Sequence, residues 1–486
     1  MSILEMTTEG LAPATANDET EIAALHIAFE AQRRAFATDR NPSLDERRNR
    51  IETLMAMMAA NRERISAAMN ADFGIHPAPA SDLLEVLSVL GRARYVLDHL
   101  EEWMRPSPRD VDSGLFGSAS AYAQSQPKGI IGNMIPWNFP FDIGVGPVIE
   151  MLAAGNRVIL KPSEYAPACA ALLREMIAAA FDPALVYVAV GGTALARAFA
   201  ALPWDHLLYT GSPNVGREIM AAAARNLTPV TLELGGKCPA LLTTGSITPR
   251  NVEAVIGTKA IKNGQMCISV DYCMVPGKEL ETFIHLAEHY AASVAEQAGN
   301  SDRTGIISER HFDRLESMLQ EARDRGSRIV QLGTGHADRA ERSMPMVLVI
   351  DPPPDLRIMR EEIFGPILPV ISYDDLDAAL DTINAGERPL GLYVFGEDQP
   401  LIDHVLATTI SGGAVVNGCA LQGALPSLGF GGIGISGMGR HHGIDGFREF
   451  SNRRGIVMRG TDDMIDAFFP PYDKARQLVA AAFPPS

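Results

Sequence analysis

Two cysteines stand close together in the stretch KNGQMCISVDYCMVP, residues 262–276, of a 486-residue chain that has only five. Cys267 follows a glycine, a glutamine and a methionine, where the chain can turn sharply and present a side chain. A thiol with a positive neighbour, a helix N-terminus or a base nearby can act as a nucleophile. Cys273 lies within the strand-like run YCMVP, which predicts a buried apolar role. From the residues alone, Cys267 is either a nucleophile or a core residue. Structural roles are predicted for Cys169, Cys238 and Cys419.

Two polar residues lie in apolar surroundings where they can assist a nucleophile. In IPWNFPF, Pro136 and Pro140 bracket Asn138 and stiffen the segment, so that the direction of its amide is fixed. A rigidly held amide N–H₂ is what an oxyanion site requires. In TLELGGK, Glu233 lies in an apolar strand before two glycines, and burial would raise its pKa and suit it to general-base chemistry. The alternative for Glu233 is a buried structural carboxylate held by hydrogen bonds.

Two further stretches are compatible with nucleotide binding. YTGSPNVG places Gly211, Ser212 and Gly216 between a strand and a helix, where phosphate can approach the backbone. The spacing is not GxGxxG and the Gly-Lys-Ser/Thr of a P-loop is missing, so an ordinary turn capped by Ser212 stays open. VILKPSE ends a strand with Lys161 and Glu164, which can hydrogen-bond ribose hydroxyls at the carboxyl edge of a sheet. Surface charges beside a turn are the alternative.

The hydrophobic pattern predicts the elements that must position these residues. Apolar residues recur every three or four positions over 21–104, which is typical of amphipathic helices. Residues 105–120 break that pattern, and AYAQSQP (121–127) alternates like an edge strand. From 129 onward short β-rich runs alternate with Ala- and Leu-rich helical stretches, in two series. This predicts an α/β fold of parallel sheets with helices on both faces, in closely packed domains without a flexible linker.

Composition limits the partners and the compartment. The net charge of −17 and the scattered 42 basic residues argue against binding to nucleic acid or to an anionic membrane. The cysteines show no CxxC pair and no metal-type spacing with histidine, so no metal site is predicted, and an odd, sparse set indicates reduced thiols in a cytoplasmic protein. The N-terminus lacks a signal pattern, and no apolar run reaches the ~18 residues of a membrane span.

Seven short motifs in this sequence together resemble those of a known enzyme superfamily. PWNFP, KPSE, YTGSPNVG, LELGGK, GQMC, EEIFGP and FGGIGISGMGRHHG occur in the order and at the spacings of the NAD(P)-dependent aldehyde dehydrogenase superfamily, over nearly the whole chain from about residue 25. Within it the chain resembles most the coniferyl aldehyde dehydrogenase group and its class-3-like relatives. The stretches that carry this finer likeness are ADFGIHPAPASDLLEV, LEEWMRP, VDYCMVP and FFPPYDKARQLVAA.

The resemblance implies a chemical role for each candidate. Cys267 would attack the aldehyde carbonyl, Asn138 and the backbone N–H of Cys267 would hold the oxyanion, and Glu233 would activate the water that hydrolyses the thioester. NAD is expected as cofactor, since Glu164 would repel a 2′-phosphate, although NADP is possible because class-3-like relatives can accept both. The residues implied in cofactor binding are Ile135, Pro136, Trp137, Lys161, Glu164, Gly211, Ser212, Gly216, Glu362 and Phe364.

The resemblance also implies an aldehyde dehydrogenase-like fold: a Rossmann-like cofactor domain with a five-stranded parallel sheet, an α/β catalytic domain and a β-arm. Exposed strand edges of the arm would promote aggregation of a monomer, so a homodimer is expected. The expected parts are a mobile N-terminus (1–20), an NAD-binding domain (21–106, 128–235 and 420–444), a catalytic domain (236–419), an oligomerisation arm (107–127 and 445–460) and a C-terminal tail (461–486).

The implied activity is NAD(P)-dependent oxidation of an aromatic or hydrophobic aldehyde to its acid. A CoA-dependent acylating enzyme and a catalytically idle family member are the alternatives; Glu233 favours water as acceptor over CoA. Three positions depart from the family pattern. Lys262 stands where asparagine is usual, Met266 where a small residue is common, and Gly429 where proline is usual. Met266 is expected to reshape the substrate tunnel and Gly429 to loosen the closing loop.

Overall fold

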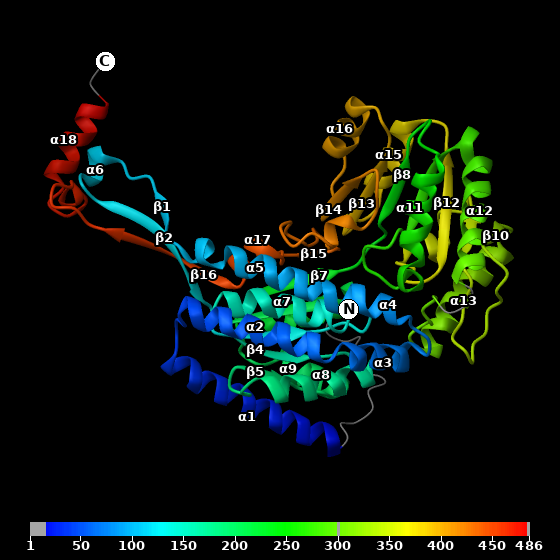
Figure 1. Cartoon of the computed structure of the whole chain (residues 1–486). Helices are drawn as coiled ribbons and strands as arrows, with labels where there is room; N and C mark the ends of the chain where they lie inside the picture. Colours follow the sequence, from blue (N-terminus) through cyan, green and yellow to red (C-terminus); the bar gives the residue numbers. More distant parts are fainter. Residues whose placement is uncertain (1–15, 299–301, 484–486) are drawn as a thin grey trace, which may run out of the picture.

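The structure is a computed structural model that describes residues 16–298 and 302–483. Three sheets organise these residues: one of six strands, one of seven and one of three. In Figure 1 the six-stranded sheet lies in the lower body, the seven-stranded sheet rises at the right, and the three-stranded sheet projects to the left. We call this projection, with the helices at its tip, the arm.

The amphipathic pattern near the N-terminus forms helices, as predicted. The first begins at Ala16, ahead of the predicted boundary, and residues 1–15 of the expected mobile segment lie outside the described residues. At the start of the second, Ser43 and Glu46 form a reciprocal capping box, which satisfies two otherwise unpaired backbone donors. The helices are α1 (Ala16–Thr38), α2 (Leu44–Ala60), α3 (Arg62–Phe73), α4 (Ala78–Ser81), the π-helical η2 (Asp82–Leu87) and α5 (Ser88–Met104).

The six-stranded sheet has the order β15-β7-β6-β3-β4-β5. All neighbours are parallel except β15, which pairs with β7 in the antiparallel sense. The predicted five-stranded parallel sheet is therefore confirmed, with one short strand added at its edge. The strands are β3 (Ile130–Met134), β4 (Arg157–Lys161), β5 (Val186–Val188), β6 (His206–Gly211), β7 (Val230–Leu234) and β15 (Gly437–Met438); the helices between them are α7 (Asp142–Ala153), α8 (Pro167–Ala180), α9 (Thr193–Ala200) and α10 (Pro213–Ala224).

Helices cover both faces of this sheet, as predicted. Buried residues of α2, α3, α5, α7 and α8 pack on one face, and those of α1, α9 and α10 on the other. The chain winds outward from β3 through β4 to β5, and then returns to place β6 on the other side of β3. The strand order thus reverses between β3 and β6, and ligands of such sheets bind outside the carboxyl ends at this point.

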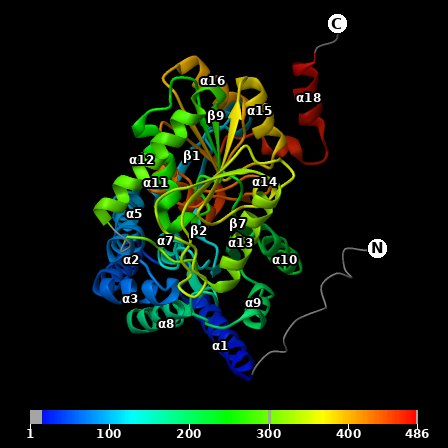
Figure 2. The same ribbon diagram turned by 90° about the vertical axis from the view of Figure 1, so that its right-hand side faces the viewer.

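The seven-stranded sheet has the order β10-β11-β12-β9-β8-β13-β14, parallel throughout except for β10. Its helices also pack on both faces, and Figure 2 shows α11 and α12 on the side opposite α13 and α15. Its strands are β8 (Pro239–Leu242), β9 (Tyr272–Pro276), β10 (Arg328–Gln331), β11 (Val347–Ile350), β12 (Ile367–Tyr373), β13 (Gly391–Phe395) and β14 (Gly413–Val416). Its helices are α11 (Pro249–Ala260), η3 (Ile261–Gly264), η4 (Gly277–Glu279), α12 (Leu280–Ala298), α13 (Glu309–Asp324), α14 (Arg357–Arg360), α15 (Leu376–Ala385), α16 (Gln399–Thr408) and η5 (Leu421–Gly423).

The arm corrects one prediction. The run 121–127 was expected to form an edge strand, but it belongs to β2, the central strand of the order β1-β2-β16. The pattern could not reveal this, because β16 comes from the other end of the chain and pairs along the full length of β2. The elements are β1 (Ser107–Arg109), α6 (Ser113–Phe116), β2 (Ser120–Pro127), α17 (Gly443–Glu449) at the base, β16 (Ser451–Met458), η6 (Ile465–Phe468) and α18 (Asp473–Ala482).

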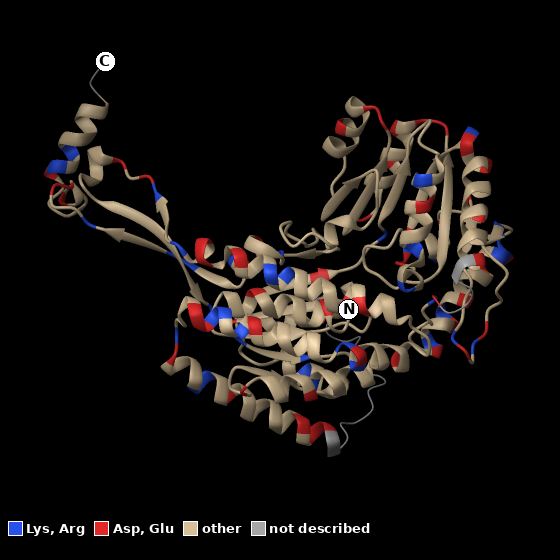
Figure 3. Cartoon of the chain, in the orientation of Figure 1, with Lys and Arg blue, Asp and Glu red and all other residues tan. Residues whose placement is uncertain are grey.

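Charged residues of both signs are spread over the helices in Figure 3. Lys and Arg alternate with Asp and Glu along the outer helices in Figure 3. Among the described residues, no helix combines the length and the apolar character needed to cross a membrane.

All five cysteines are free thiols.

Candidate active site

Cys267 follows a tight turn, η3, that ends α11. Within it Lys262 has a left-handed backbone (φ 47°), and Gly264 follows at φ 76°. A Cβ on Gly264 would lie 2.2 Å from the carbonyl oxygen of Gly365, so that only glycine fits this close approach. The turn leaves Cys267 half-buried, whereas the other four cysteines are buried. The predicted contrast with Cys273, which is fully buried in β9, is confirmed.

Asn138 is held beside the Cys267 loop. Its side-chain amide donates a hydrogen bond of 3.2 Å to the backbone carbonyl of Gln265, two residues before the thiol. Gln265 is itself immobilised, since its amide nitrogen donates to the carbonyls of Lys262 and Gly305, both at 2.9 Å, and its amide oxygen accepts from the N–H of Ile307 at 3.0 Å. The Asn138 amide has two N–H groups, so one remains available to a developing oxyanion.

Glu233 lies near the end of β7 and is 3% exposed. Neither of its carboxylate oxygens has a hydrogen-bond partner within the protein. The Nε2 of His441 lies 3.8 Å from Oε1, but burial and the charge of Arg92 lower the pKa of this histidine well below its usual value, which favours the neutral ring. Burial raises the pKa of Glu233 well above its usual value, against the opposing charge of Arg440. A buried, unpartnered carboxyl of this kind can hold or accept a proton from water or substrate, and the predicted structural alternative, a carboxylate held by hydrogen bonds, lacks those bonds.

Glu362 lies against the two glycines that follow β7. Its carboxylate accepts a hydrogen bond of 3.2 Å from the N–H of Gly236, and a Cβ on Gly235 would lie 2.2 Å from the carboxylate oxygens. Burial, and then the negative charge of Asp271, raises the pKa of Glu362 to about 8. The missing side chain at Gly235 therefore lets this carboxylate approach the end of β7.

The thiol and the two carboxylates interact electrostatically. Burial raises the pKa of the Cys267 thiol, and the negative charges of Glu362 and Glu233 raise it further. Both carboxylates are thus within electrostatic reach of the sulfur, although they come from different segments. The protonated thiol is the favoured form, so thiolate formation requires a proton acceptor or a positive charge in the site.

The KPSE residues lie at the carboxyl end of β4, on one side of the switch point. Lys161 is buried, and its Nζ donates to the Glu164 carboxylate at 3.0 Å. The side chain of Glu164 is 42% exposed, so the pair can present both a donor and an acceptor outward. Next to it, the N–H of Ile135 donates to the carbonyl of Lys161 at 2.9 Å, which joins the PWNFP segment to this edge.

The YTGSPNVG residues lie on the other side of the switch point, between β6 and α10. Gly211 ends the strand, and the exposed Ser212 caps the helix by accepting a weak, 3.5 Å hydrogen bond from the N–H of Val215. Gly216 differs from them: its N–H already donates to the carbonyl of Ser212, and it packs against Leu234. The predicted cap is therefore present, and helix–sheet packing accounts for Gly216.

Aromatic rings link the PWNFP segment to the EEIFGP segment. The rings of Trp137 and Phe364 meet edge-to-face, with centroids 5.2 Å apart. The ring of His311 lies equally close to Trp137. Arg314 donates to the backbone carbonyl of Glu362 at 3.3 Å and so holds the segment from α13. Neither His311 nor Arg314 was identified from the sequence, where both are ordinary polar residues of an amphipathic helix. Pro136, beside Trp137, is half-buried.

A partly buried ion pair that sequence reasoning missed also fixes the EEIFGP segment. Lys237, directly after LELGG, pairs with Asp271 and donates to the carbonyls of Ile358 at 2.7 Å and Glu361 at 3.1 Å. Asp271 accepts from the N–H of Ile363 at 3.0 Å. Its position as the last residue of the LELGGK motif was the one available indication for Lys237.

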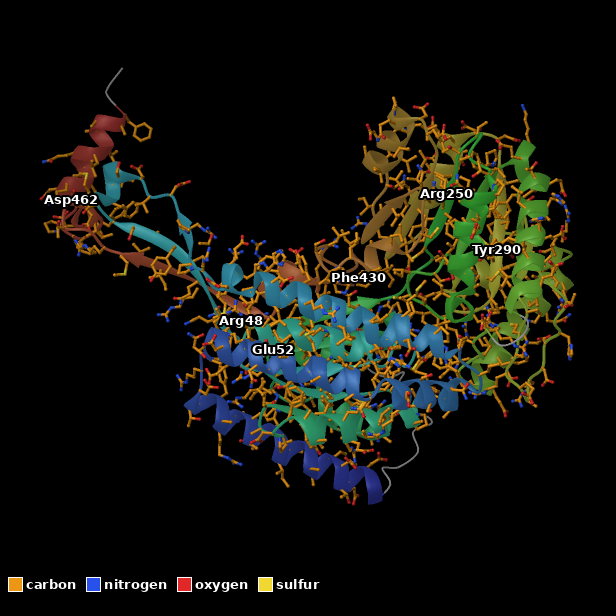
Figure 4. All side chains as sticks on the ribbon, in the orientation of Figure 1. Arg48, Glu52, Arg250, Tyr290, Phe430 and Asp462 are labelled. Carbon is orange, nitrogen blue, oxygen red and sulfur yellow. The ribbon has the colours of Figure 1, made fainter. Side chains whose placement is uncertain are left out.

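The two departures near the site lie in packed surroundings. Met266 is 7% exposed and belongs to an apolar cluster that includes Phe139 and Ile268. Gly429 lies so close to Asp445 that a Cβ would meet its carboxylate at 2.4 Å. Phe430 follows it, and Figure 4 places this side chain where the closing loop passes between the lower body and the seven-stranded sheet.

The described residues fit a dinucleotide better than a metal ion. The switch point has a buried lysine paired with an exposed glutamate on one side, and a strand-to-helix turn with a 12-residue helix on the other. These features match the ribose and phosphate groups of a dinucleotide. No group of three or more His, Cys, Asp or Glu among residues 16–298 and 302–483 could hold a metal ion.

Comparisons with known proteins identify the family of this chain. Residues 7–456 match the model of the aldehyde dehydrogenase family. A probable coniferyl aldehyde dehydrogenase of Caulobacter vibrioides is 38% identical, over 95% of this chain and 97% of its own. A coniferyl aldehyde dehydrogenase of Pseudomonas sp. is 36% identical, over 90% and 91%. The substrate-bound structure of Staphylococcus aureus AldH is 30% identical and superposes with a TM-score of 0.88, over 94% of this chain and 99% of that one.

Proposed function

This chain belongs to the aldehyde dehydrogenase family and is an NAD(P)-dependent aldehyde dehydrogenase, and we propose that its substrate is an aromatic or hydrophobic aldehyde of the coniferyl aldehyde type. The likeness to two coniferyl aldehyde dehydrogenases supports this substrate class. So do the apolar residues around the thiol, since Cys267 packs against a cluster that contains Phe139, Met266 and Ile268.

One observation carries the proposed chemistry. A half-buried thiol, a buried amide and two buried carboxylates come from four separate segments: the Asn138 amide donates to the loop that carries Cys267, and the negative charges of Glu233 and Glu362 raise the pKa of the thiol. The Cys267 thiol would release its proton to solvent, and its sulfur would add to the aldehyde carbon as the carbonyl π bond opens onto oxygen. The oxyanion that forms would accept hydrogen bonds from the Asn138 amide and the backbone N–H of Cys267, and each such donor lowers the barrier by ~3 kcal/mol.

Bound NAD(P) supplies the hydride acceptor that converts the thiohemiacetal into a thioester. Glu233 would then take a proton from water as the water oxygen attacks the thioester carbon. The carbon–sulfur bond breaks, the carboxylic acid leaves, and the Cys267 thiol is restored. We propose that Lys161 and Glu164 bind the adenosine ribose, that Gly211 and Ser212 meet the pyrophosphate, that Glu362 holds the nicotinamide ribose, and that Ile135, Pro136, Trp137 and Phe364 line the nicotinamide end.

The domain division and the assembly are part of the same proposal. The body around the six-stranded sheet would bind the cofactor, the seven-stranded sheet would form the catalytic domain, and the arm would bridge two subunits. The exposed side chains of Val457, Met458, Phe468 and Phe469 on the arm support a homodimer, because apolar residues of this size are otherwise unfavourable in water. Five free thiols support a cytoplasmic location.

The activity test is formation of NADH from NAD with a panel of aldehydes, from coniferyl aldehyde and benzaldehyde to short aliphatic aldehydes. We expect kcat/KM to be highest for the aromatic members, and the free acid as product whether or not CoA is present. Cys267→Ala should abolish turnover. Cys273→Ala is the matched control, since that thiol is fully buried in β9, and it should retain turnover. Full activity of Cys267→Ala would remove the proposed nucleophile, and a preference for aliphatic aldehydes would remove the substrate class.

A further inference from the structure

A buried ion pair lies beneath the proposed oxyanion site. Lys262 in the Cys267 turn contacts Glu85 in the π-helical turn η2 through its Nζ, and the side chains of both residues are 0% exposed. Burying two charges is costly unless further hydrogen bonds satisfy them. The remaining contacts of each partner therefore indicate what the pair holds in place.

Glu85 holds the start of α7. One of its carboxylate oxygens accepts from the backbone N–H groups of Phe141 at 3.0 Å and Asp142 at 2.8 Å. Phe141 occupies the N-cap position of α7 and forms no side-chain cap itself. The carboxylate thus replaces a local cap from a distant helix, and it stabilises the chain three residues after Asn138.

Lys262 holds Asn138 directly. Its Nζ donates to the backbone carbonyl of Asn138 at 2.5 Å and stands 3.6 Å from the centre of the Phe139 ring. The side-chain amide of Asn138 donates to Gln265, three residues after Lys262. The segment that precedes Cys267 therefore forms hydrogen bonds with both the backbone carbonyl and the side-chain amide of Asn138.

We propose that the Lys262–Glu85 pair is a positioning device for the oxyanion donor: it sets the Asn138 amide relative to the Cys267 sulfur, so that both reach one carbonyl group. This inference rests on the proposed role of Asn138. A cation with several directional donors can hold the asparagine carbonyl, the glutamate and an aromatic ring at once, which an apolar side chain cannot. A shift of about 1 Å in such an arrangement can cost a factor of about 100 in rate.

The test is a mutational cycle in the full-length enzyme. Lys262→Met alone would leave Glu85 buried without a partner, so the main variant combines Lys262→Met with Glu85→Gln, which removes both charges together. We expect this paired variant to lower the pre-steady-state rate of NADH formation about 10- to 100-fold, with the KM for NAD unchanged. Lys128→Met removes a partly buried lysine that does not contact Asn138, and it should leave the rate unchanged.

The same pair is then introduced into Asn138→Ala. If the pair acts through Asn138, it should lower the rate by less than about twofold in that background, since the two losses do not add. An equal loss in both backgrounds, or no loss in the normal one, would overturn the positioning role. A normal rate in Asn138→Ala would instead contradict the proposed function, so the two failures are distinguishable. If the paired variant does not fold, Lys262→Arg supports the same cycle, because it keeps the charge opposite Glu85 but changes the geometry of the donors at the Asn138 carbonyl.

Discussion

The side-chain amide of Asn138 and the backbone carbonyl of Gln265 are joined by a hydrogen bond of 3.2 Å, although the residues are 127 positions apart in the chain. This bond connects the loop after β3 to the loop that carries Cys267, and so links the six-stranded sheet to the seven-stranded sheet. The proposed oxyanion donor and the proposed nucleophile thus approach each other only when the two sheets are assembled.

Glu233→Gln should separate the two halves of the reaction. Thioester formation does not need this carboxylate, so the variant should release about one equivalent of NADH per site in a burst and then turn over at least about 100-fold more slowly. Stopped-flow absorbance measures both phases. A steady-state rate equal to that of the unaltered enzyme would contradict water activation by Glu233.

The rate of thioester hydrolysis should rise with pH. The raised pKa of Glu233 keeps the carboxyl protonated at low pH, and the base form appears only as the pH rises through that value. The rise should be absent in Glu233→Gln. Glu449→Gln is the control: Glu449 contributes to the raised pKa of Glu233, so its neutralisation should move the rise to lower pH without removing it.

Glu164→Gln should relax the choice of cofactor. The Glu164 carboxylate would repel a 2′-phosphate. It also accepts a hydrogen bond of 3.0 Å from the Lys161 ammonium, which is then less available to a phosphate. Neutralising it should raise the ratio of kcat/KM for NADP to that for NAD about tenfold or more, because like charges at a binding site cost several kcal/mol. Glu175→Gln, which alters an exposed ion pair with Arg64, should leave the ratio unchanged. A clear preference of the unaltered enzyme for NADP would count against the ribose role of Glu164.

Lys237→Met should weaken cofactor binding more than it slows the chemistry. It leaves Asp271 buried without its partner and removes the donors to Ile358 and Glu361, which hold the Glu362 segment. Lys237 is only partly buried, so leaving the Asp271 carboxylate without its partner should cost about 1–3 kcal/mol of stability. We expect a lower thermal midpoint and a higher KM for NAD, measured beside the surface control Lys278→Met. An unchanged KM would show that the segment does not depend on this pair.

Val457→Asp should weaken the proposed dimer. Val457 is 66% exposed on β16, the long outer strand of the arm, and a carboxylate there would have to be desolvated in an interface. Light scattering across a dilution series should show the dimer dissociating at higher protein concentration than normal. Val294→Asp, at an exposed position of α12 in the opposite part of the molecule, serves as the control. A monomeric unaltered protein would contradict the arm's proposed role.

Sequence reasoning performed well where the relevant pattern is contiguous. The runs YCMVP and ILPVISY coincide with β9 and β12, and the apolar run around Cys273 correctly predicted that this thiol is buried. It performed poorly where a partner is remote. Nothing in AYAQSQP indicates that β16 covers its second edge, and nothing in RHHG places His441 3.8 Å from Glu233.

The amino-acid order by itself determined the succession of strands and helices, the parallel sense of the two large sheets and the residue types available for chemistry. These features depend on local periodicity and short motifs, which involve only neighbouring residues. Only the tertiary structure decided which side chains share one small volume. Lys262 and Glu85 are 177 positions apart, and each is an isolated charge in its own segment. Packing that excludes water converts these two charges into a pair, because a buried charge must find its partner within hydrogen-bonding distance.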